Sequence, residues 1–279
     1  MLELHCHTTC SDGTLSPEEL VQAAIAAGVK AMAITDHDTL AGWERAIAAA
    51  GEQLEIVPGL ELSTVHNERS LHILGYYPNR HQLEGPLRDR LQGRRRRAQA
   101  MADKLAALGY PIELPEMPGD MAPCRPHIAR ALVQAGYVSH VQEAFTRWLG
   151  DEGPAYVQYD KFTAAEGIAL LRACGAVPVW AHPYLFRGGS VETVLPELLA
   201  AGLMGIEVYH PHHSLSDQRR LAAMCDRYGL LITGGSDYHG PTDRKNKAGL
   251  GLNGQQVPLS LLPPLKAAAI TLKETKIPS

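Results

Sequence analysis

The chain has few cysteines, no long apolar run and no large excess of one charge. Its five cysteines include no Cys-x-x-Cys pair, which argues against disulfide bonds and a structural zinc site. No apolar stretch approaches the roughly 20 residues that a helix needs to cross a bilayer. A net charge of -4 argues against bulk electrostatic binding to a DNA duplex or an anionic membrane. We therefore expect neither partner.

The first residues do not have the form of a secretory signal. Glu3, His5 and His7 interrupt the apolar residues there and no basic segment precedes them, so we expect a cytoplasmic protein. Apolar residues make up 45% of the chain and charged residues 20%, as in ordinary globular proteins. At 279 residues, the chain could form two average domains or one large α/β barrel with additions.

Short apolar runs typical of buried parallel strands recur along the chain. They begin near Leu2, Lys30, Glu55, Val177, Gly205 and Leu230. Within each set of three, neighbouring runs are separated by about one βα unit. Capping boxes begin at Ser16 and Thr163, and Gly28 and Gly175 are placed to end the helices that follow them. Repeated βα units predict a parallel barrel or a doubly wound sheet.

A long interval without this repeat separates the two sets of strands. It contains one more predicted strand at 70–77, an arginine-rich helix at 83–109, a proline-rich link, and helices at 126–135 and 139–149. We interpret residues 80–155 as a helical insertion that covers the barrel mouth and contributes to substrate binding. The barrel would then comprise residues 1–79 and 156–279.

Histidines and carboxylates gather around the predicted strand ends. They occur as His5 with His7, Asp36-His37-Asp38, Glu61, His72, His182, His210, and Asp237 with His239. In a parallel barrel the carboxyl ends of the strands share one face, where active sites form. A single buried histidine is usually a core residue with a hydrogen-bond partner, but so many polar strand ends would each need a separate partner. The pattern therefore predicts one polar site.

The first strand end has the spacing of a metal site. His5 and His7 are two residues apart, so both imidazoles project from the same face of an extended strand. The polar turn that follows could bring Asp12 back over the strand end. Taken alone, this spacing is equally compatible with one core histidine and one surface histidine. Cys6 alternates to the opposite face and is expected to pack in the core.

Together these motifs carry a family resemblance. His5-x-His7, Thr35-Asp36-His37, Gly59-x-Glu61, Ala181-His182-Pro183 and Ser236-Asp237-x-His239 resemble the PHP (polymerase and histidinol phosphatase) family of metal-dependent phosphoesterases. The resemblance implies an α/β fold, a distorted (β/α)7 TIM-like and amidohydrolase-like barrel, with a multinuclear metal centre. It implies the metal ligands His5, His7, Asp12, His37, Glu61, His72, His182, Asp237 and His239. Asp12 stands where many relatives have histidine, which exchanges a neutral ligand for a charged one.

The implied ligand set suits a trinuclear centre. Six imidazoles and three carboxylates give three divalent transition ions about three protein ligands each, with Glu61 placed to bridge. We expect Mn²⁺, with Fe²⁺ or Zn²⁺ as alternatives. Such a centre lowers the pKa of water to about 7 and supplies a bridging hydroxide that attacks phosphorus. We expect Asp12, His37 and Glu61 to act in catalysis, and Asp36 and Asp38 to orient His37 or neighbouring backbone.

The predicted insertion carries two basic features. Arg94, Arg95, Arg96 and Arg97 fan around a helix, so only one or two can face the barrel, and a solvated surface is the competing interpretation for each. Arg125 and His127 open a later helix, and Arg130 lies one turn further on. We expect Arg94, Arg95 and Arg97 together with Arg125, His127 and Arg130 to bind a second phosphate. Surface charge with a structural helix cap is the alternative.

A substrate with one phosphate on the metals and one on these basic residues would be a nucleoside bisphosphate or a 5'-phosphorylated RNA end. The segments 125–130, 148–150 and 153–157 also resemble the PHP subfamily of 3',5'-nucleoside bisphosphate phosphatases and 5'-to-3' exoribonucleases on very short RNA. The resemblance implies conversion of adenosine 3',5'-bisphosphate to AMP and phosphate. Exonuclease action on short RNA is the main alternative. Histidinol-phosphate phosphatase activity and a non-catalytic metal-binding or polymerase-associated role are weaker ones.

Further side chains could serve catalysis or substrate binding. His210 or His213, after the penultimate strand, could protonate the leaving 3' oxygen or bind the phosphate, and a polar loop is an equal alternative. Trp148, Tyr156, Phe186 or Tyr209 could stack on a base, although core packing is the commoner role of aromatic side chains.

Overall fold

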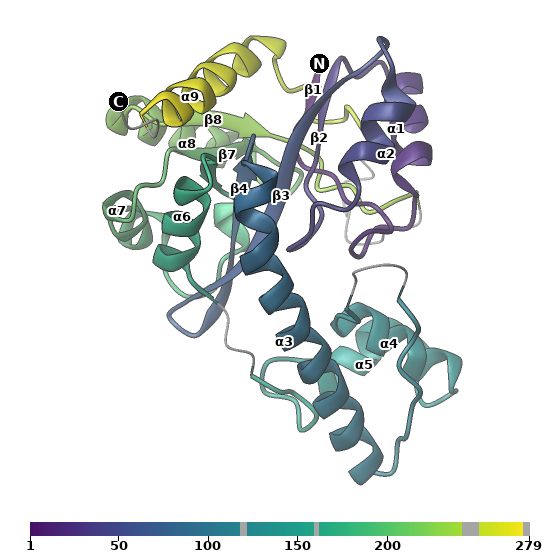
Figure 1. Cartoon of the computed structure of the whole chain (residues 1–279). Helices are drawn as coiled ribbons and strands as arrows, with labels where there is room; N and C mark the ends of the chain where they lie inside the picture. The colour runs from purple at the N-terminus through teal and green to yellow at the C-terminus, as the bar shows by residue number, and fades with distance from the viewer. Residues whose placement is uncertain (118–121, 159–161, 242–250, 276–279) are drawn as a thin grey trace. The chain divides into compact units, whose positions relative to one another are not determined.

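The computed structural model describes residues 1–117, 122–158, 162–241 and 251–275. The chain divides into two units, which we call the barrel unit (Met1–Glu84 with Lys161–Ser279) and the helical unit (Gly85–Asp160). Figure 1 shows their elements, and each unit has its own hydrophobic core. Within the described ranges, no helix combines the length and apolar composition that crossing a bilayer requires.

The barrel unit is built around one mixed β-sheet. Its strands are β1 (Leu2–Glu3), β2 (Ala31–Ile34), β3 (Glu55–His66), β4 (Arg69–Tyr76), β5 (Phe162–Thr163), β6 (Val177–Trp180), β7 (Gly205–Tyr209) and β8 (Leu231–Gly234). The order around the sheet is β1-β2-β3-β4-β6-β7-β8, and the short β5 pairs with the end of β3. Each of the six apolar runs predicted as a parallel strand overlaps one of these strands.

The sheet closes on itself through the residues that follow β1 and β8. The Leu4 amide donates to the Gly234 carbonyl (3.1 Å) and the His7 amide donates to the Tyr238 carbonyl (2.9 Å). Gly235 lies in this seam, where an added Cβ atom would be only 2.5 Å from the backbone nitrogen of His5. The close approach therefore requires glycine. These contacts complete a distorted barrel of seven strands.

One strand, β4, departs from the parallel pattern that the βα repeat predicted. β3 and β4 form an antiparallel hairpin, and β4 is also antiparallel to β6. Asn67 and Glu68 make the turn with φ values of 46° and 60°, as a two-residue hairpin turn requires. β3 extends to His66, so Glu61 lies inside the strand rather than at its end. A hairpin needs no helical crossover, which explains why the βα repeat stops here.

Helices cover the outside of the sheet. They are α1 (Pro17–Ala26), α2 (Trp43–Ala50), α6 (Ala164–Ala173), α7 (Val191–Ala200), α8 (Leu215–Tyr228) and α9 (Leu262–Glu274), with 3-10 turns η2 (Pro183–Leu185) and η3 (Leu259–Leu261). In Figure 1, α1 and α2 flank β1 and β2, whereas α6, α7 and α8 lie on the side of β7 and β8. The predicted capping boxes at Ser16 and Thr163 are present. Gly28 and Gly175 follow their helices with left-handed φ values of 77° and 71°.

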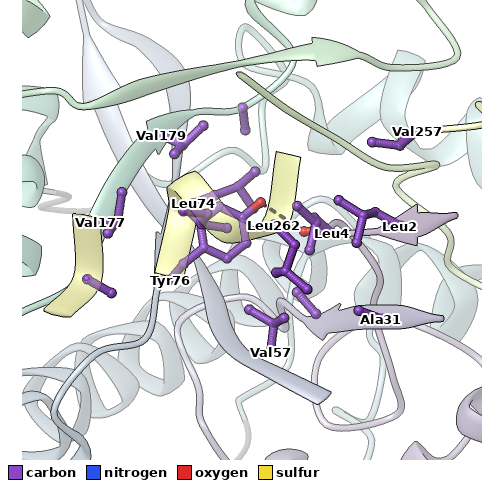
Figure 2. Packing of buried hydrophobic residues seen from close by; sticks show 14 of the residues in the cluster. Leu2, Leu4, Ala31, Val57, Leu74, Tyr76, Val177, Val179, Val257 and Leu262 are labelled. Carbon is purple, nitrogen blue, oxygen red and sulfur yellow. Dashed lines mark hydrogen bonds between the residues drawn. The ribbon is translucent and has the colours of Figure 1, made fainter. Parts of the chain in front are cut away.

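The core of the barrel unit fills the end where the parallel strands begin. Strand residues such as Leu2, Ala31, Val57 and Val177 are buried there, and Leu262, Leu265, Ala269 and Leu272 of α9 pack against the same cluster (Figure 2). The buried Tyr76 hydroxyl donates to the Leu4 carbonyl (2.9 Å), so this polar group is satisfied. Apolar side chains thus occupy this end of the barrel. The polar residues lie at the carboxyl ends of the parallel strands.

The helical unit has a separate core. It contains most of α3 (Arg80–Ala107), together with α4 (Arg125–Gln134), α5 (Val141–Ala144) and a π-helical turn, η1 (Phe145–Leu149). Met101 and Leu105 of α3 pack with Ile128 and Leu132 of α4 and with Trp148. The helices predicted at 83–109 and 126–135 are therefore present, and the helix predicted at 139–149 is divided between α5 and η1.

Candidate metal centre

The structure brings the nine predicted ligands together in the barrel unit. Each has an imidazole nitrogen or carboxylate oxygen within 3.3 Å of such an atom of another member. The nine come from the residues following β1, β2, β6 and β8 and from β3 and β4 themselves. As expected, His5 and His7 share one face, with ring centroids 5.3 Å apart, and Cys6 is buried.

Glu61 lies between two sets of imidazoles. Its Oε2 is 3.3 Å from His5 Nε2, 3.2 Å from His7 Nε2 and 3.2 Å from His37 Nδ1. Its Oε1 is 2.8 Å from His72 Nδ1 and 3.0 Å from His182 Nε2. The side chain is 1% exposed. One buried carboxylate is thus positioned to bridge two cations, one on each oxygen.

Two aspartates complete the arrangement. Asp12 Oδ1 is 3.2 Å from His239 Nε2 and 3.7 Å from His7 Nδ1. Asp237 Oδ1 is 3.3 Å from His5 Nε2 and 3.1 Å from His7 Nε2. The turn after β1 therefore does return Asp12 to the histidines, as its polar sequence predicted.

Three overlapping groups have ligand atoms close enough to hold a metal ion. We call them the Asp12 group (His7, Asp12, His37, His239), the His5 group (His5, His7, Glu61, Asp237) and the His72 group (His37, Glu61, His72). Within each group the ligand atoms lie within 4.8 Å of one another. His182 adjoins the His72 group through Glu61 Oε1.

Buried polar atoms without hydrogen-bond partners face the same centre. His5 Nε2, His7 Nε2 and Asp12 Oδ1 are buried and have no hydrogen bond among the residues that the structure describes. Each such atom costs about 1–3 kcal/mol when left unsatisfied. Cations would satisfy all three, and mixed imidazole and carboxylate donors suit manganese, iron or zinc. The residues therefore fit a multinuclear transition-metal centre.

Burial and mutual contacts shift the pKa values of these groups. Burial lowers the pKa of His37 to about 3, against the opposing attraction of Glu61 and Asp12, so this ring is neutral and able to bind metal at pH 7. Burial opposes protonation of His7, but the nearby carboxylates of Asp237 and Glu61 raise its pKa to about 10. A proton on His7 thus offsets negative charge on the buried carboxylates. A bound metal ion would offset the same charge.

Asp36 and Asp38 hold backbone close to the candidate ligands. Asp36 accepts hydrogen bonds from the Thr8 amide (2.8 Å), the Thr8 hydroxyl (2.7 Å) and the Ser11 hydroxyl (2.6 Å). These bonds fix the loop that carries Asp12. Asp38 accepts from the Ser63 amide (2.8 Å), on the strand that carries Glu61. Both contacts correspond to the predicted orientation of neighbouring backbone.

Three residues around the site have left-handed backbone conformations that are unfavourable for non-glycine residues. The φ values are 54° for Asp38, 33° for His182 and 52° for Asp237. Such conformations cost about 1–3 kcal/mol each and persist where surrounding contacts enforce them. Their occurrence at three strand ends is typical of a functional site.

Sequence reasoning missed Glu207, whose carboxylate is fully buried in β7. It contacts His5 Nδ1 (2.9 Å) and accepts a hydrogen bond from the His182 amide (2.8 Å). The available signal was an acidic residue between the apolar residues Ile206 and Val208 of a buried strand, because such a charge needs a partner.

His210 and His213 follow β7 and differ in their hydrogen bonds. His210 Nδ1 accepts from the His212 amide (3.2 Å), and its Nε2 is 3.7 Å from Asp237 Oδ2. His213 Nδ1 donates to the Val208 carbonyl (2.9 Å). Burial lowers the pKa of His213 to about 4, so this ring is neutral at pH 7. In the neutral state His210 therefore carries its proton on Nε2, whereas His213 carries its proton on Nδ1.

The predicted basic residues lie in the helical unit and form a partial cluster. Arg97 and Arg125 both lie over the Tyr156 ring, at 5.3 and 5.6 Å. Burial lowers the pKa of Arg97, and the nearby Arg125 and Arg94 lower it further. Arg125 also donates to Asp151 (2.7 Å). Arg95 and Arg130 are exposed, Arg94 is half-buried, and His127 Nδ1 accepts from the Cys124 amide (3.1 Å) as part of the α4 cap.

The aromatic candidates have identifiable packing roles. Trp148 is buried in the core of the helical unit and packs against Tyr110 with the two rings tilted at 46°. Tyr156 lies beneath the guanidinium groups of Arg97 and Arg125. Phe186 packs against Trp180 and His66, and Tyr209 borders the barrel core. Tyr156 is the candidate whose ring adjoins the basic cluster.

Comparison with known proteins identifies the family. A model of the PHP domain matches residues 3–110. The chain is 35% identical over 246 residues to a Haemophilus influenzae protein named 5'-3' exoribonuclease, covering 86% of this chain and 90% of the relative. The chain belongs to the PHP family. This PHP chain is also 33% identical over 254 residues to a Chromobacterium violaceum protein named 3',5'-nucleoside bisphosphate phosphatase, covering 86% of this chain and 87% of the relative.

A solved structure agrees with the barrel. A Bifidobacterium adolescentis protein assigned as a metal-dependent phosphoesterase matches with a TM-score of 0.84 and 30% identity, covering 96% of both chains. The predicted family and the predicted distorted (β/α)7 barrel are confirmed. This PHP chain thus combines the fold of metal-dependent phosphoesterases with three groups of side chains that could hold metal ions.

Proposed function

We propose that this PHP protein is a metal-dependent phosphatase that removes the 3'-phosphate from nucleoside 3',5'-bisphosphates. Adenosine 3',5'-bisphosphate would give AMP and inorganic phosphate. The observation that carries the proposal is the position of Glu61, whose two oxygens contact different imidazoles. The relative named 3',5'-nucleoside bisphosphate phosphatase supports the choice of substrate.

We assign all nine converging residues as ligands of three divalent ions. Mn²⁺ is our first choice, and Fe²⁺ or Zn²⁺ would suit the same donors. When bound, the ions would lower the pKa of water and withdraw charge from phosphate oxygens. Glu61 would be a ligand in both the His5 group and the His72 group. Asp12 and His37 would be ligands in the Asp12 group. Three divalent ions would exceed the charge of three carboxylates, and that surplus suits a phosphate monoester.

His210 is the group that we assign as hydrogen-bond donor, through Nε2, to the phosphate or the leaving 3' oxygen. Its Nδ1 accepts a backbone hydrogen bond, so the proton of the neutral ring is on Nε2. That nitrogen is buried and has no hydrogen bond among the described residues. His213 would serve instead to hold the loop or accept a hydrogen bond from substrate, because its proton is committed to Val208.

The basic residues of the helical unit would bind the 5'-phosphate. Guanidinium groups form strong, paired hydrogen bonds with phosphate oxygens, and Arg97 with Arg125 supplies two of them beside Tyr156. His127 and Arg130 on α4, with Arg94 and Arg95 on α3, would extend this contact. A single-phosphate substrate such as histidinol phosphate gives these residues no role.

A second candidate is a 5'-to-3' exoribonuclease that acts on short 5'-phosphorylated RNA. The relative from Haemophilus influenzae with that name favours it. The same basic residues would then hold the 5' end. The two activities differ in their products, because the exonuclease releases nucleoside monophosphates from RNA whereas the phosphatase releases inorganic phosphate.

The test is a product assay with the manganese-loaded protein. Adenosine 3',5'-bisphosphate, histidinol phosphate and a 5'-phosphorylated dinucleotide are compared, and both phosphate and nucleotide release are measured. We expect equimolar AMP and phosphate from the bisphosphate at the highest kcat/KM. A higher kcat/KM on the dinucleotide would favour the exonuclease, and preference for histidinol phosphate would overturn the two-phosphate proposal.

A further inference from the structure

Glu207 is a buried carboxylate that contacts two different parts of the candidate metal centre. It lies in β7 with 0% exposure. Its Oε1 is 2.9 Å from His5 Nδ1, and its Oε2 accepts the His182 amide at 2.8 Å. Both oxygens are thus engaged, one by a side chain after β1 and the other by backbone after β6.

The contact with His5 determines which ring nitrogen can bind metal. A carboxylate only accepts hydrogen bonds, so His5 Nδ1 must carry the proton. Nε2 is then the nitrogen available to a cation, and it faces Glu61 Oε2 and Asp237 Oδ1 at 3.3 Å each. A hydrogen bond on the distal nitrogen is the usual way in which proteins orient a metal-binding histidine.

The contact with His182 supports a strained backbone. His182 has φ 33° and ψ 60°, a conformation that residues with a Cβ adopt at a cost. The hydrogen bond from its amide to Glu207 anchors it there. Its Nε2 consequently lies 3.0 Å from Glu61 Oε1, on the opposite carboxylate oxygen from His5.

We infer that Glu207 is a positioning residue that ties the His5 group to the His182 side of the centre. It sets the tautomer of His5 and the backbone of His182, and both contacts converge on Glu61. The inference rests on the metal centre of the proposed function, but it concerns metal affinity and leaves the identity of the substrate open.

The substitution Glu207→Gln separates this role from simple packing. Glutamine has nearly the same shape, but it has one acceptor oxygen and one donor amide. If the oxygen accepts the hydrogen bond from the His182 amide, the NH₂ group faces His5 Nδ1 and makes that nitrogen an acceptor. The His5 proton then moves to Nε2, and Nε2 can no longer bind metal. If the amide is flipped, two donors face each other at His182. Either orientation breaks one of the two contacts.

The experiment is a manganese titration of metal-free protein, with free Mn²⁺ followed by electron paramagnetic resonance. We expect Glu207→Gln to weaken the affinity of at least one ion about 10- to 100-fold, as loss of a partner behind a metal ligand does. Tyr76→Phe is the matched control, because it removes another buried barrel hydrogen bond whose acceptor is the Leu4 backbone carbonyl and not the side chain of a candidate ligand. We expect its manganese affinity to equal that of the wild type.

A spectroscopic readout follows the tautomer itself. In zinc-loaded, ¹⁵N-labelled protein, the His5 ring is expected to carry its proton on Nδ1 in the wild type and in Tyr76→Phe. In Glu207→Gln we expect either the Nε2–H form or loss of the zinc-bound His5 signal. An unchanged Nδ1–H spectrum together with wild-type manganese affinity would overturn the inference.

A second variant covers the case in which Glu207→Gln does not fold. Glu207→Asp keeps two acceptor oxygens on a shorter side chain, so weakened manganese affinity is expected, and affinity equal to that of the wild type would overturn the inference. The proposed function fails separately, if wild-type protein binds manganese tightly but hydrolyses neither the bisphosphate nor the dinucleotide.

Discussion

Histidines that follow the same strand differ in the hydrogen bonds that their rings make. His210 and His213 follow the same strand, but the first accepts a backbone hydrogen bond on Nδ1 and the second donates one. Their available Nε2 atoms are therefore a donor and an acceptor, respectively.

Replacement of His210 should affect turnover without affecting metal content. We expect His210→Ala to lower kcat on adenosine 3',5'-bisphosphate about 10²- to 10³-fold, the usual contribution of a positioned hydrogen-bond donor to developing negative charge. Bound manganese, measured by mass spectrometry, should not change. His212→Ala is the control because His212 is exposed and its backbone amide remains. Wild-type kcat in His210→Ala would remove this residue from the mechanism.

Protonation of His213 should contribute to loss of stability in mild acid. Its folded pKa of about 4 is below the ordinary value of 6.5, so the unfolded chain binds this proton first. The stability that neutral His213 provides is therefore present above pH 6.5 and is lost as the pH falls toward 4. Between pH 7 and pH 5 we expect this residue to account for about 2 kcal/mol.

Urea unfolding of the metal-free wild type and of His213→Asn at pH 7 and pH 5 measures this loss of stability. Asparagine can still donate toward Val208 but does not titrate, so the variant should lose less stability than the wild type on acidification. Equal losses in both proteins would show that His213 is not the titrating group.

At the scale of elements, the seam between β1 and β8 determines where His5 lies. Gly235 approaches His5 closely. A Cβ atom added to Gly235 would be 2.5 Å from the backbone nitrogen of His5 and 2.6 Å from the Cβ of His5. Neither atom belongs to the flexible end of a side chain, so the two segments would have to separate. The glycine thus has a direct effect on the position of a candidate ligand.

Gly235→Ala should therefore destabilise the protein and weaken metal binding together. We expect a loss of about 1–3 kcal/mol in the free energy of unfolding, typical of overpacking a tight site. Gly85→Ala is the control because that helical glycine has open space around it, and it should be neutral or slightly stabilising. Urea unfolding of both variants measures the change in the free energy of unfolding. A Gly235→Ala protein as stable as the wild type would contradict the tight seam.

Helix α4 provides the prediction for substrate recognition. The double variant Arg125→Ala with Arg130→Ala should raise KM for adenosine 3',5'-bisphosphate while leaving hydrolysis of a simple aryl phosphate unchanged. The reason is that only the first substrate has a second phosphate for these guanidinium groups. Arg96→Ala is the matched control, since Arg96 is exposed on α3. Equal effects on both substrates would argue against a 5'-phosphate contact.

The elements also show what the sequence could predict and what it could not. Strand positions and capping boxes were predictable because apolar periodicity and local side-chain hydrogen bonds encode them. The antiparallel direction of β4 was not, since an apolar run has the same pattern in either direction. Glu207 was missed because its partner His5 is 202 positions away in the chain, and only the fold brings them together.

For the molecule as a whole, the barrel gathers residues from position 5 to position 239 into one site. The apolar core with α9 fills one end, and the nine candidate ligands occupy the carboxyl ends of the parallel strands and the neighbouring hairpin. Buried carboxylates and histidines at this density are costly unless they neutralise each other or bind cations. The metal centre is thus the claim on which the proposed activity depends.

Anomalous diffraction from manganese-loaded crystals tests that claim most directly. We predict three manganese peaks, one in contact with the His5 group, one with the Asp12 group, and one with Glu61 Oε1, His72 and His182. Glu61 should contact two of them through different oxygens. Crystals grown with excess manganese that show no anomalous peak within coordination distance of Glu61 would contradict the proposed centre.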